Sequence, residues 1–531
     1  MTSLLGIYAF IIVVCVLLNN FSNKIGMPVL LAFIVLGMLF GNISGMQIEN
    51  SFEATDNICS AALVFIMFYS GFGTNWGIAK RVAKEASLLA SVGVVITAIV
   101  TGLFCHFVLR WGWLEAMLMG SVISSTDAAS VFSILRSRKL GLKNNIAPML
   151  EVESGSNDPL SNMLTVLFVS LMQSGMGAGA AAWMLLKQIT LGAGLGFAIG
   201  LAAVYVMRHF NFATSGFDSL FVFAIALFSF AIPNTIGGNG YLSAYIVGII
   251  LGNSTFPGKK ALVGFFDGVT NLMMVIIFFD LGLLGRPESL FDSILPALAI
   301  FFCLLLISRP IAIFSVLAPT RKYDFRQQVF TSFVGLRGAA SVVFAIIAMC
   351  SGVNLEHDIF SIVFCIVLIS IAVQGSFIPK VAEMLGVIDE NSDVMKTFTD
   401  FAEETLMQFS EINITETHSW AGKTIMELNI PKEVLICMVI RPDGSKVIPR
   451  GKTLLKTGDK LVACSKAFVD ETLLRVAEQT IEPGSKYIGR CLKEFPANKN
   501  QIVLIKRGDE RIIPHGDTTF IEGDVLYFNI S

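Results

Sequence analysis

Charged side chains are scarce in this sequence, and the motifs that mark common classes of soluble enzyme are missing. Asp, Glu, Lys and Arg make up 15% of the 531 residues, hydrophobic residues make up 54%, and mean hydropathy is +0.71. Ordinary soluble proteins do not have this composition. The sequence holds no nucleophile–base pair, no HExxH and no phosphate-binding loop. We therefore expect neither an enzyme nor a nucleic-acid-binding protein.

Paired cysteines and a cleavable leader are also missing. The nine cysteines show no paired spacing, so a disulfide framework or a zinc site is not expected. The first apolar segment, Leu4–Leu18, lacks a preceding basic region and a small-residue cleavage site. We interpret it as a retained helix and not as a signal peptide. No cofactor is expected, and no metal other than a transported monovalent cation.

Long apolar runs are what the sequence does contain. A transmembrane helix needs about 20 mostly apolar residues, and such runs recur until residue 381, after which charges become frequent and β-rich runs appear. We predict an all-α polytopic membrane domain at 1–385, a linker at 386–413 and an α+β domain after it. The predicted spans, about thirteen, are 4–21, 28–42, 58–76, 86–109, 113–135, 147–173, 188–207, 217–232, 240–253, 264–284, 292–317, 327–350 and 357–381.

The distribution of charge predicts the orientation in the bilayer. Basic residues gather in alternate loops, for example Lys80/Arg81, Arg136/Arg138 and Arg321/Lys322, whereas the intervening loops hold acids such as Glu53 and Glu356. By the positive-inside rule the N-terminus is external and the C-terminal domain cytoplasmic. We expect a multi-pass protein of the cytoplasmic (inner) cell membrane.

An internal repeat appears when the sequence is shifted by 211 positions. The shift places Gly37 on Gly248, Gly71 on Gly282, and Ala128-Ala129-Ser130-Val131 on Ala339-Ala340-Ser341-Val342. It maps each predicted helix onto the seventh helix after it, and an odd step inverts the orientation. Inverted repeats with interrupted helices at the midplane are typical of secondary transporters. We predict that the fifth and twelfth helices are interrupted; the alternative is close packing of small residues.

Two aspartates inside apolar runs are the candidate functional groups. Asp127 follows Thr126, and Asp158 follows Ser154 and Asn157. A carboxylate at membrane depth costs several kcal/mol and usually marks an ion or proton path. Asp158 could bind either a proton or a cation, with oxygens of Ser154, Asn157 and Thr126 replacing water. Asp127 is either a second ligand or a residue that organises the interrupted helix.

Two further charges are expected to have a structural role. Glu153 and Arg337 would each be costly alone at depth, so we predict that they form an ion pair joining the interrupted helices. Arg309 is another buried charge, for which Asp280, Asp267 or the cytoplasmic surface are the candidate partners.

Three motifs resemble the sodium–proton and potassium–proton antiporters of the NhaP/NHE branch: Thr126-Asp127, Glu153-Ser154-x-x-Asn157-Asp158 and Gly335-Leu336-Arg337-Gly338. The resemblance covers roughly residues 1–385. It implies that Asp158 binds the ion and the proton, that Asn157 and Thr126 assist it, and that the Glu153–Arg337 pair is structural. It also implies a homodimer, and an electroneutral exchange because Asn precedes Asp158.

One position departs from the family pattern. Many relatives carry an acid in the third helix where this chain has Tyr69, so a gating or second-ligand acid is missing there. Asp280, the counterpart of Tyr69 in the repeat, either substitutes for it or lies near the outer mouth. Three histidines near helix ends are interpreted as interfacial residues and not as pH sensors: His106, His209 and His357.

The tail contains a second repeat. Trp420-Ala421-Gly422 recurs as Tyr487-Ile488-Gly489, and Gly458-Asp459 recurs as Gly523-Asp524. This looks like two copies of the RCK C-terminal (TrkA-C) domain, at 414–480 and 481–531. No Gly-x-Gly-x-x-Gly follows a strand in the tail, so a nucleotide-binding Rossmann lobe is not expected. In relatives the domain dimerises and binds small ligands, including cyclic dinucleotides; a passive dimerisation module is the alternative.

These features together predict a secondary active antiporter that exchanges a monovalent cation for H⁺, with regulation by the tail. The tail's kinship to potassium regulators favours K⁺ over Na⁺ or Li⁺. A Na⁺(Li⁺)/H⁺ antiporter is the first alternative. A tail-gated cation channel is the second, but the sequence has no Thr-Val-Gly-Tyr-Gly filter.

Overall fold

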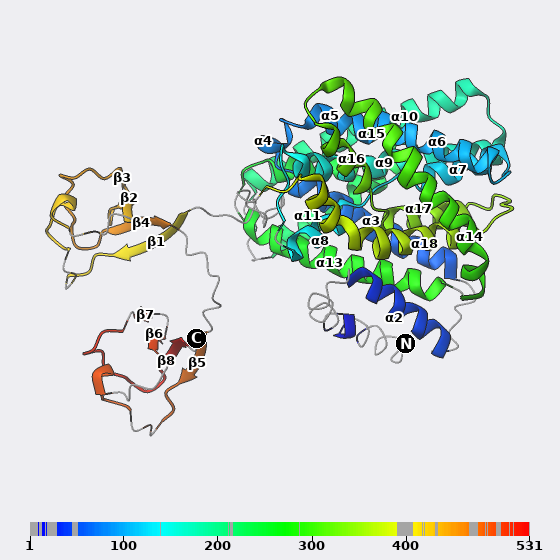
Figure 1. The fold of residues 1–531 in the computed structure, drawn as a ribbon. Coiled ribbons are helices and arrows are strands. Elements are labelled where there is room, and N and C mark those ends of the chain that lie inside the picture. Colours follow the sequence, from blue (N-terminus) through cyan, green and yellow to red (C-terminus); the bar gives the residue numbers. More distant parts are fainter. Residues whose placement is uncertain are drawn as a thin grey trace. The chain divides into compact units, whose positions relative to one another are not determined.

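The computed structural model describes most of residues 29–389 and 407–529, together with a few residues before 29. The larger segments outside the described residues are 1–8, 18–28, 45–50, 213–215, 390–406, 431–433, 467–475 and 495–500. Two compact units are present, Met1–Glu404 and Thr405–Ser531. The first is helical and the second is built of strands (Figure 1).

The first unit is a bundle of apolar helices. By length and composition alone, seven helices in the described residues could cross a membrane, and one of the shorter apolar helices, Ala339–Cys350, is half of an interrupted span. The predicted span at 4–21 lies mostly outside the described residues. The helices are α2 (Val29–Ser44), α3 (Ser51–Gly73), α4 (Trp76–Ala79), α5 (Ala83–Leu88), α6 (Val94–Phe107), α7 (Trp113–Val122), α8 (Ala128–Ser137), α9 (Ile146–Ser174), α10 (Ala178–His209), α11 (Phe217–Thr235), α12 (Gly240–Gly252), α13 (Lys259–Leu284), α14 (Pro287–Cys303), α15 (Arg309–Leu317), α16 (Phe325–Phe333), α17 (Ala339–Cys350), α18 (Ile359–Ile369) and α19 (Gly375–Leu385).

The prediction of two interrupted helices is confirmed. Non-helical backbone separates α7 from α8 at residues 123–127, and α16 from α17 at residues 334–338. Three other spans remain continuous but contain a single π-helical turn, at η1 (Leu89–Gly93), η2 (Leu304–Ser308) and η4 (Ser370–Gln374). Such turns are rare and are frequent near functional sites. All three lead directly into the next helix: η1 into α6, η2 into α15 and η4 into α19.

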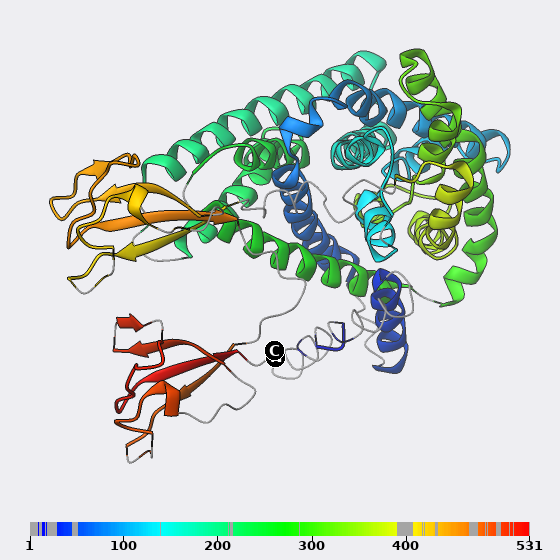
Figure 2. The same ribbon diagram turned by 60° about the vertical axis from the view of Figure 1, so that its left-hand side comes forward.

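Contacts between glycines and backbone carbonyls confirm the internal repeat. A Cβ added to Gly37 of α2 would collide with the carbonyl oxygen of Phe279 in α13. A Cβ added to Gly248 of α12 would collide in the same way with that of Phe68 in α3. The shift of 211 positions converts each member of the first pair into a member of the second. Helices α2 and α13 lie side by side in both views (Figures 1 and 2), and the pairing of α3 with α12 repeats this contact.

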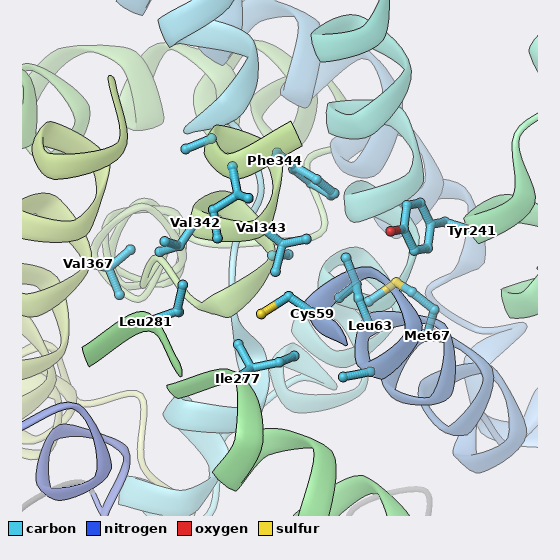
Figure 3. Close-up of a cluster of buried hydrophobic side chains, with 14 of the residues drawn as sticks. Cys59, Leu63, Met67, Tyr241, Ile277, Leu281, Val342, Val343, Phe344 and Val367 are labelled. Carbon is cyan, nitrogen blue, oxygen red and sulfur yellow. The ribbon is translucent and has the colours of Figure 1, made fainter. Parts of the chain in front are cut away.

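Both halves of the first unit contribute to one apolar core. Figure 3 shows side chains from α3, α12, α13, α17 and α18 meeting in a single cluster. Burial of such side chains contributes about 1.5–3 kcal/mol each where water is the alternative, whereas within a bilayer close packing is the main gain. The cluster includes Cys59, Leu63, Met67, Tyr241, Ile277, Leu281, Val342, Val343, Phe344 and Val367.

The second unit contains two equivalent antiparallel sheets. The first has the order β1-β4-β2-β3 and the second the order β5-β8-β6-β7. Both carry a register shift in the third strand of that order, at Ile436/Met438 and at Ile502/Leu504. The strands are β1 (Met407–Asn413), β2 (Val434–Ile440), β3 (Lys446–Val447), β4 (Lys460–Lys466), β5 (Val476–Thr480), β6 (Gln501–Arg507), β7 (Glu510–Ile512) and β8 (Val525–Asn529).

The sheets begin earlier than the sequence predicted. Strand β1 pairs with β4 along its whole length, so the first copy includes Met407–Asn413, which the sequence assigned to the linker. Strand β5 likewise opens the second copy at Val476 and not at 481. The described residues of the tail form strands and short 3₁₀ turns, η5 (Ile425–Glu427) and η6 (Leu492–Glu494), so the α part of the predicted α+β fold does not appear among them.

Candidate ion-binding site

The two interruptions meet and hydrogen-bond to each other. The backbone N–H of Asp127 donates to the carbonyl oxygen of Leu336 at 2.8 Å. The guanidinium of Arg337 donates through Nη1 to the carbonyls of Ser124 and Ser125, at 2.9 and 2.6 Å. These carbonyls follow the C-terminal end of α7, where a cation is favoured because the end of a helix carries partial negative charge. Arg337 therefore completes the broken end of the opposite helix.

Asp158 lies on α9, against the first interruption. Its side chain is buried, with 7% of the residue exposed, and its Oδ1 accepts a hydrogen bond from the Ser125 hydroxyl. Within the described residues no Lys or Arg lies within ion-pair distance of it. A buried carboxylate without a permanent counter-charge needs a proton or a cation to offset its desolvation. In the described residues the Asp158 carboxylate thus has no permanent positive partner to offset its burial.

Three neighbouring polar residues on the same two elements, Thr126, Ser154 and Asn157, also carry neutral oxygens. Asn157 Nδ2 donates to the Thr126 hydroxyl at 2.6 Å, while its Oδ1 is buried without a hydrogen-bond donor among the described residues. Ser154 Oγ donates to the Thr126 carbonyl at 2.8 Å and accepts from the Ala128 N–H at 2.9 Å. The structure therefore brings Thr126, Ser154 and Asn157 into contact with one another. A partly dehydrated monovalent cation would find hydroxyl, carbonyl and amide oxygens there.

Asp127 caps the second half of its interrupted helix. Its carboxylate accepts from both the N–H and the hydroxyl of Ser130, the third residue of α8, which is the geometry of an N-cap. The sequence left two roles open, and this contact supports organisation of the helix over direct ligation of the ion.

The predicted ion pair between Glu153 and Arg337 is wrong. Glu153 Oε1 lies 2.7 Å from Nη1 of Arg309, and the two side chains are 1% and 4% exposed. The guanidinium of Arg337 is instead occupied by the two carbonyls of the interrupted helix, and α15 brings Arg309 to Glu153. The candidate partners considered for Arg309, Asp280 and Asp267, were therefore also wrong.

The two buried arginines, Arg309 and Arg337, have a common environment. Arg309 and Arg337 line the same small cavity with Ser332, Ser370 and Gln374, and Gly335 leaves room for the Arg309 side chain, since a Cβ there would lie 2.6 Å from Nε. Nε and Nη2 of Arg309 are buried without hydrogen-bond partners in the described part of the chain. Among the described residues, the carboxylate that forms an ion pair with one of these two guanidinium groups is Glu153, through Arg309.

The accessory candidates lie on α3 and α13. The Tyr69 hydroxyl donates to Asp267 Oδ1 at 3.4 Å. Asp280 is buried, with 5% exposed, and follows Phe279 at the contact of α13 with α2. In the described part of the chain no hydrogen bond or ion pair joins Asp280 to Asp158, so the structure does not assemble it with the other site residues.

Sequence reasoning missed two participants, Ser125 and Tyr245, and the pairing of Arg309 with Glu153. Ser125 donates to Asp158, Arg309 pairs with Glu153, and the Tyr245 hydroxyl accepts from Ser156 at 2.9 Å beside Gly155. A hydroxyl directly before the Thr126-Asp127 pair was the available signal for Ser125. Nothing in the sequence indicated that α12 would place Tyr245 against α9.

Comparison with known proteins identifies two families in the chain. Residues 9–383 match the family described as "Sodium/hydrogen exchanger, transmembrane", and residues 409–470 and 476–530 match the TrkA-C domain. Two similar sequences are the K(+)/H(+) antiporter NhaP of Alkalimonas amylolytica, 33% identical over 88% of this chain and 81% of that protein, and NhaP2 of Shewanella sp. (strain MR-4), 30% identical over 92% and 85%. The sodium proton antiporter MjNhaP1 from Methanocaldococcus jannaschii has the same fold, with a TM-score of 0.63 at 22% identity over 72% of this chain and 98% of that one.

Proposed function

The chain belongs to the sodium/hydrogen exchanger family, and from that premise we propose that it exchanges K⁺ for H⁺ with Asp158 as the shared binding group. The coarser statement follows from the family: the protein is a multi-pass membrane antiporter of monovalent cations and protons, of the NhaP type. It has two TrkA-C copies in its tail. The family is one of transporters and not of enzymes, and it uses no prosthetic cofactor.

The observation that carries the proposal is the burial of Asp158 beside hydroxyl and amide groups without a basic partner. A carboxylate in this setting is stabilised by one positive charge at a time. When a cation enters from one side, the proton leaves; when a proton enters from the other, the cation leaves. Asp158 contacts Ser125 in the first interruption, and in the proposed cycle alternating access exposes the carboxylate to each side of the membrane in turn.

Potassium is the proposed cation because of the relatives. The two relatives described above are each at least 30% identical to this chain, and both are named K⁺/H⁺ antiporters. A Na⁺/H⁺ antiporter, ApNhaP of Aphanothece halophytica, is 25% identical over 71% of this chain. Exchange of Na⁺ or Li⁺ is the alternative that keeps the same site and mechanism.

The site also supports a one-for-one exchange. Asn157 stands beside Asp158 where a second carboxylate would permit a second proton, and Asp127 is engaged in capping α8. One uncompensated carboxylate carries one H⁺ or one K⁺ per cycle. We therefore propose electroneutral transport.

The remaining proposals concern orientation, assembly and control. We propose an external N-terminus and a cytoplasmic tail from the distribution of basic loops. We propose a homodimer, and a regulatory tail whose sheets bind a small ligand such as a cyclic dinucleotide. A channel gated by the tail is disfavoured because an inverted repeat with a buried acid is typical of carriers.

The test is collapse of a preformed pH gradient in everted vesicles on addition of K⁺, Na⁺ or Li⁺ in turn. We expect K⁺ to give the largest response, saturating with concentration, and an inserted Asp158→Asn variant to give none. Retained exchange in Asp158→Asn would remove Asp158 as the carrier group. Current through the protein without proton movement would favour the channel.

A further inference from the structure

Three side chains that can bind a metal ion lie close together, away from the two helix interruptions. Glu115 lies in the first turn of α7, and Glu356 and His357 lie in the loop between α17 and α18. One ligand atom from each lies within 4.8 Å of the others. We propose that these residues form a binding site for a divalent first-row transition cation, with Zn²⁺ as the best fit. The proposal is independent of the transport function.

Glu115 supplies the first argument, because its buried carboxylate lacks a permanent counter-charge. The residue is 5% exposed, and within the described residues its ion-pair partner is His357. An imidazole is positively charged only when protonated. With Glu356 nearby, the cluster holds two negative charges, and a buried carboxylate is costly unless a positive charge compensates it. A divalent cation would neutralise both.

The spacing of the donors supplies the second argument. Glu115 Oε2 lies 3.3 Å from Nδ1 of His357. Two donors bound tetrahedrally at the usual zinc distances lie about 3.3–3.5 Å apart, so these two atoms already have the separation that one Zn²⁺ requires. Glu356 is exposed and can rotate towards them as a third ligand. Water would complete the coordination.

Neighbouring groups hold His357 in position. Its backbone N–H donates to Glu115 Oε1 at 2.9 Å, and its ring stacks on Trp111 with centroids 4.2 Å apart and an interplanar angle of 16°. The carbonyl of Trp111 in turn lies 2.8 Å from His106 Nδ1. Because the ring and the carboxylate are held in place before the metal binds, the entropic cost of binding is lower. Residues that hydrogen-bond to metal ligands have this role in known metal sites.

The mixture of donors selects the ion. Mg²⁺ and Ca²⁺ prefer sites made of oxygen donors alone, whereas an imidazole nitrogen with two carboxylates suits Zn²⁺ and its first-row neighbours. The bound ion would join α7, the first half of one interrupted helix, to the loop that follows α17, the last half of the other. The positive-inside prediction places this loop on the external face, so the metal would come from outside the cell.

The first test is isothermal titration of Zn²⁺ into the full-length detergent-purified protein after removal of any polyhistidine tag. We expect one site per chain, and a binding constant at least tenfold weaker in Glu356→Gln. Glu356 is exposed, so this variant should fold normally, which its thermal transition without metal would show. His209→Gln, which changes an exposed histidine at the end of α10, is the matched control and should bind as the unaltered protein does. No one-site binding, or equal binding by Glu356→Gln, would overturn the proposal.

A second test locates the ion. Co²⁺ quenches indole fluorescence at short range, so its binding to His357 should quench Trp111, which stacks on that ring. We expect saturable quenching that excess Zn²⁺ reverses and that disappears in Trp111→Phe. Saturable quenching that persists unchanged in Glu356→Gln would place the metal elsewhere and contradict the assignment.

Discussion

Asp127 and Gly338 occupy equivalent positions in the two repeats and lie against each other where the interrupted helices cross. A Cβ on Gly338 would be 2.5 Å from Cβ of Asp127 and 2.7 Å from its Oδ2. The shift of 211 positions converts one residue into the other, so the two-fold relation between the repeats passes near this contact. One repeat has an acid that caps α8, and the other has a glycine that leaves space for it. Because one side has an acid and the other a glycine, the interruptions approach closely enough for the Asp127 N–H to donate a hydrogen bond to the Leu336 carbonyl.

Substitution of Gly338 by alanine should separate the two interruptions. The added methyl group has no space, because the atoms it meets belong to a residue that is itself fixed by Ser130. We expect a loss of about 1–3 kcal/mol of stability, as for other overpacked positions, and a large loss of exchange. Thermal unfolding in detergent and vesicle exchange measure the two effects. Gly264→Ala is the control, since a Cβ there has no neighbour within 4 Å and alanine favours the helix; equal behaviour of the two variants would contradict the close contact.

The pairing of Glu153 with Arg309 can be tested by a double-mutant cycle. Glu153→Gln leaves two buried guanidinium groups around one cavity without a counter-charge, so it should cost about 3–5 kcal/mol. Arg309→Gln should cost less, because Arg337 remains on the same cavity. The double variant should be more stable than Glu153→Gln alone. If adding Arg337→Gln, and not Arg309→Gln, rescues Glu153→Gln, then Arg337 is the partner and the assignment is wrong.

Ser125 should affect the affinity for the cation. Its hydroxyl donates to Asp158, and a hydrogen bond to a charged group is worth about 1.5–3 kcal/mol. Ser125→Ala should therefore raise the KM for the cation roughly tenfold or more, a change equivalent to about 1.4 kcal/mol. Ser174→Ala, at the exposed end of the same helix as Asp158, is the control and should leave KM unchanged. An unaltered KM in Ser125→Ala would show that the hydroxyl has no role in binding.

The architecture was predictable from the sequence because it leaves local signals. Apolar runs of the length of a bilayer give the helices, and the glycines of the repeat mark the positions where helices touch backbone to backbone. The Thr126-Asp127 and Gly335–Gly338 segments indicated where helices are interrupted, because small and polar residues there replace the apolar side chains of a continuous transmembrane helix. Asp158, Asn157, Thr126 and Ser154 were found for the same reason.

The partners of charged residues were not predictable in the same way. A sequence shows that Glu153 and Arg337 are each costly at depth, but it gives no distance between them. Arg309 is an equally costly charge. Arg337 donates its hydrogen bonds to the neutral carbonyls of Ser124 and Ser125, and Arg309 forms the ion pair with Glu153. Such carbonyls become available only after a helix is broken. The start of the first sheet was missed for a related reason, since β1 is defined by pairing with β4, more than forty residues away.

The second sheet of the tail should lose stability in acid. Burial alone would raise the pKa of Asp524, but hydrogen bonds from Arg507 and from the Ile521 N–H outweigh it and hold that pKa below its ordinary value. The carboxylate therefore contributes stability above its unfolded pKa of about 3.9, and the contribution is lost as the pH falls through the lower, folded pKa. Hydrogen exchange in β5–β8 at pH 3 to 7 measures this. In Asp524→Asn that part of the pH dependence should disappear; an unchanged profile would show that another group is responsible.

Removal of the tail should alter control and leave the exchange reaction intact. Every group placed at the two helix interruptions, from Ser124 to Ser370, lies in the first unit. The second unit forms its own sheets, each with a buried Asp paired with a partly exposed Arg. A chain ending at residue 399 should therefore still collapse a pH gradient in a cation-dependent manner, with Asp158→Asn in the same truncation as the blank. Its dependence on pH or on a tail ligand should differ from that of the full chain, because the proposed regulatory element has been removed. The comparison needs equal amounts of inserted protein, measured in the same vesicles. If a folded, inserted truncation moved no ions at all, the tail would have to act directly in the transport cycle, and a regulatory role alone would no longer account for it.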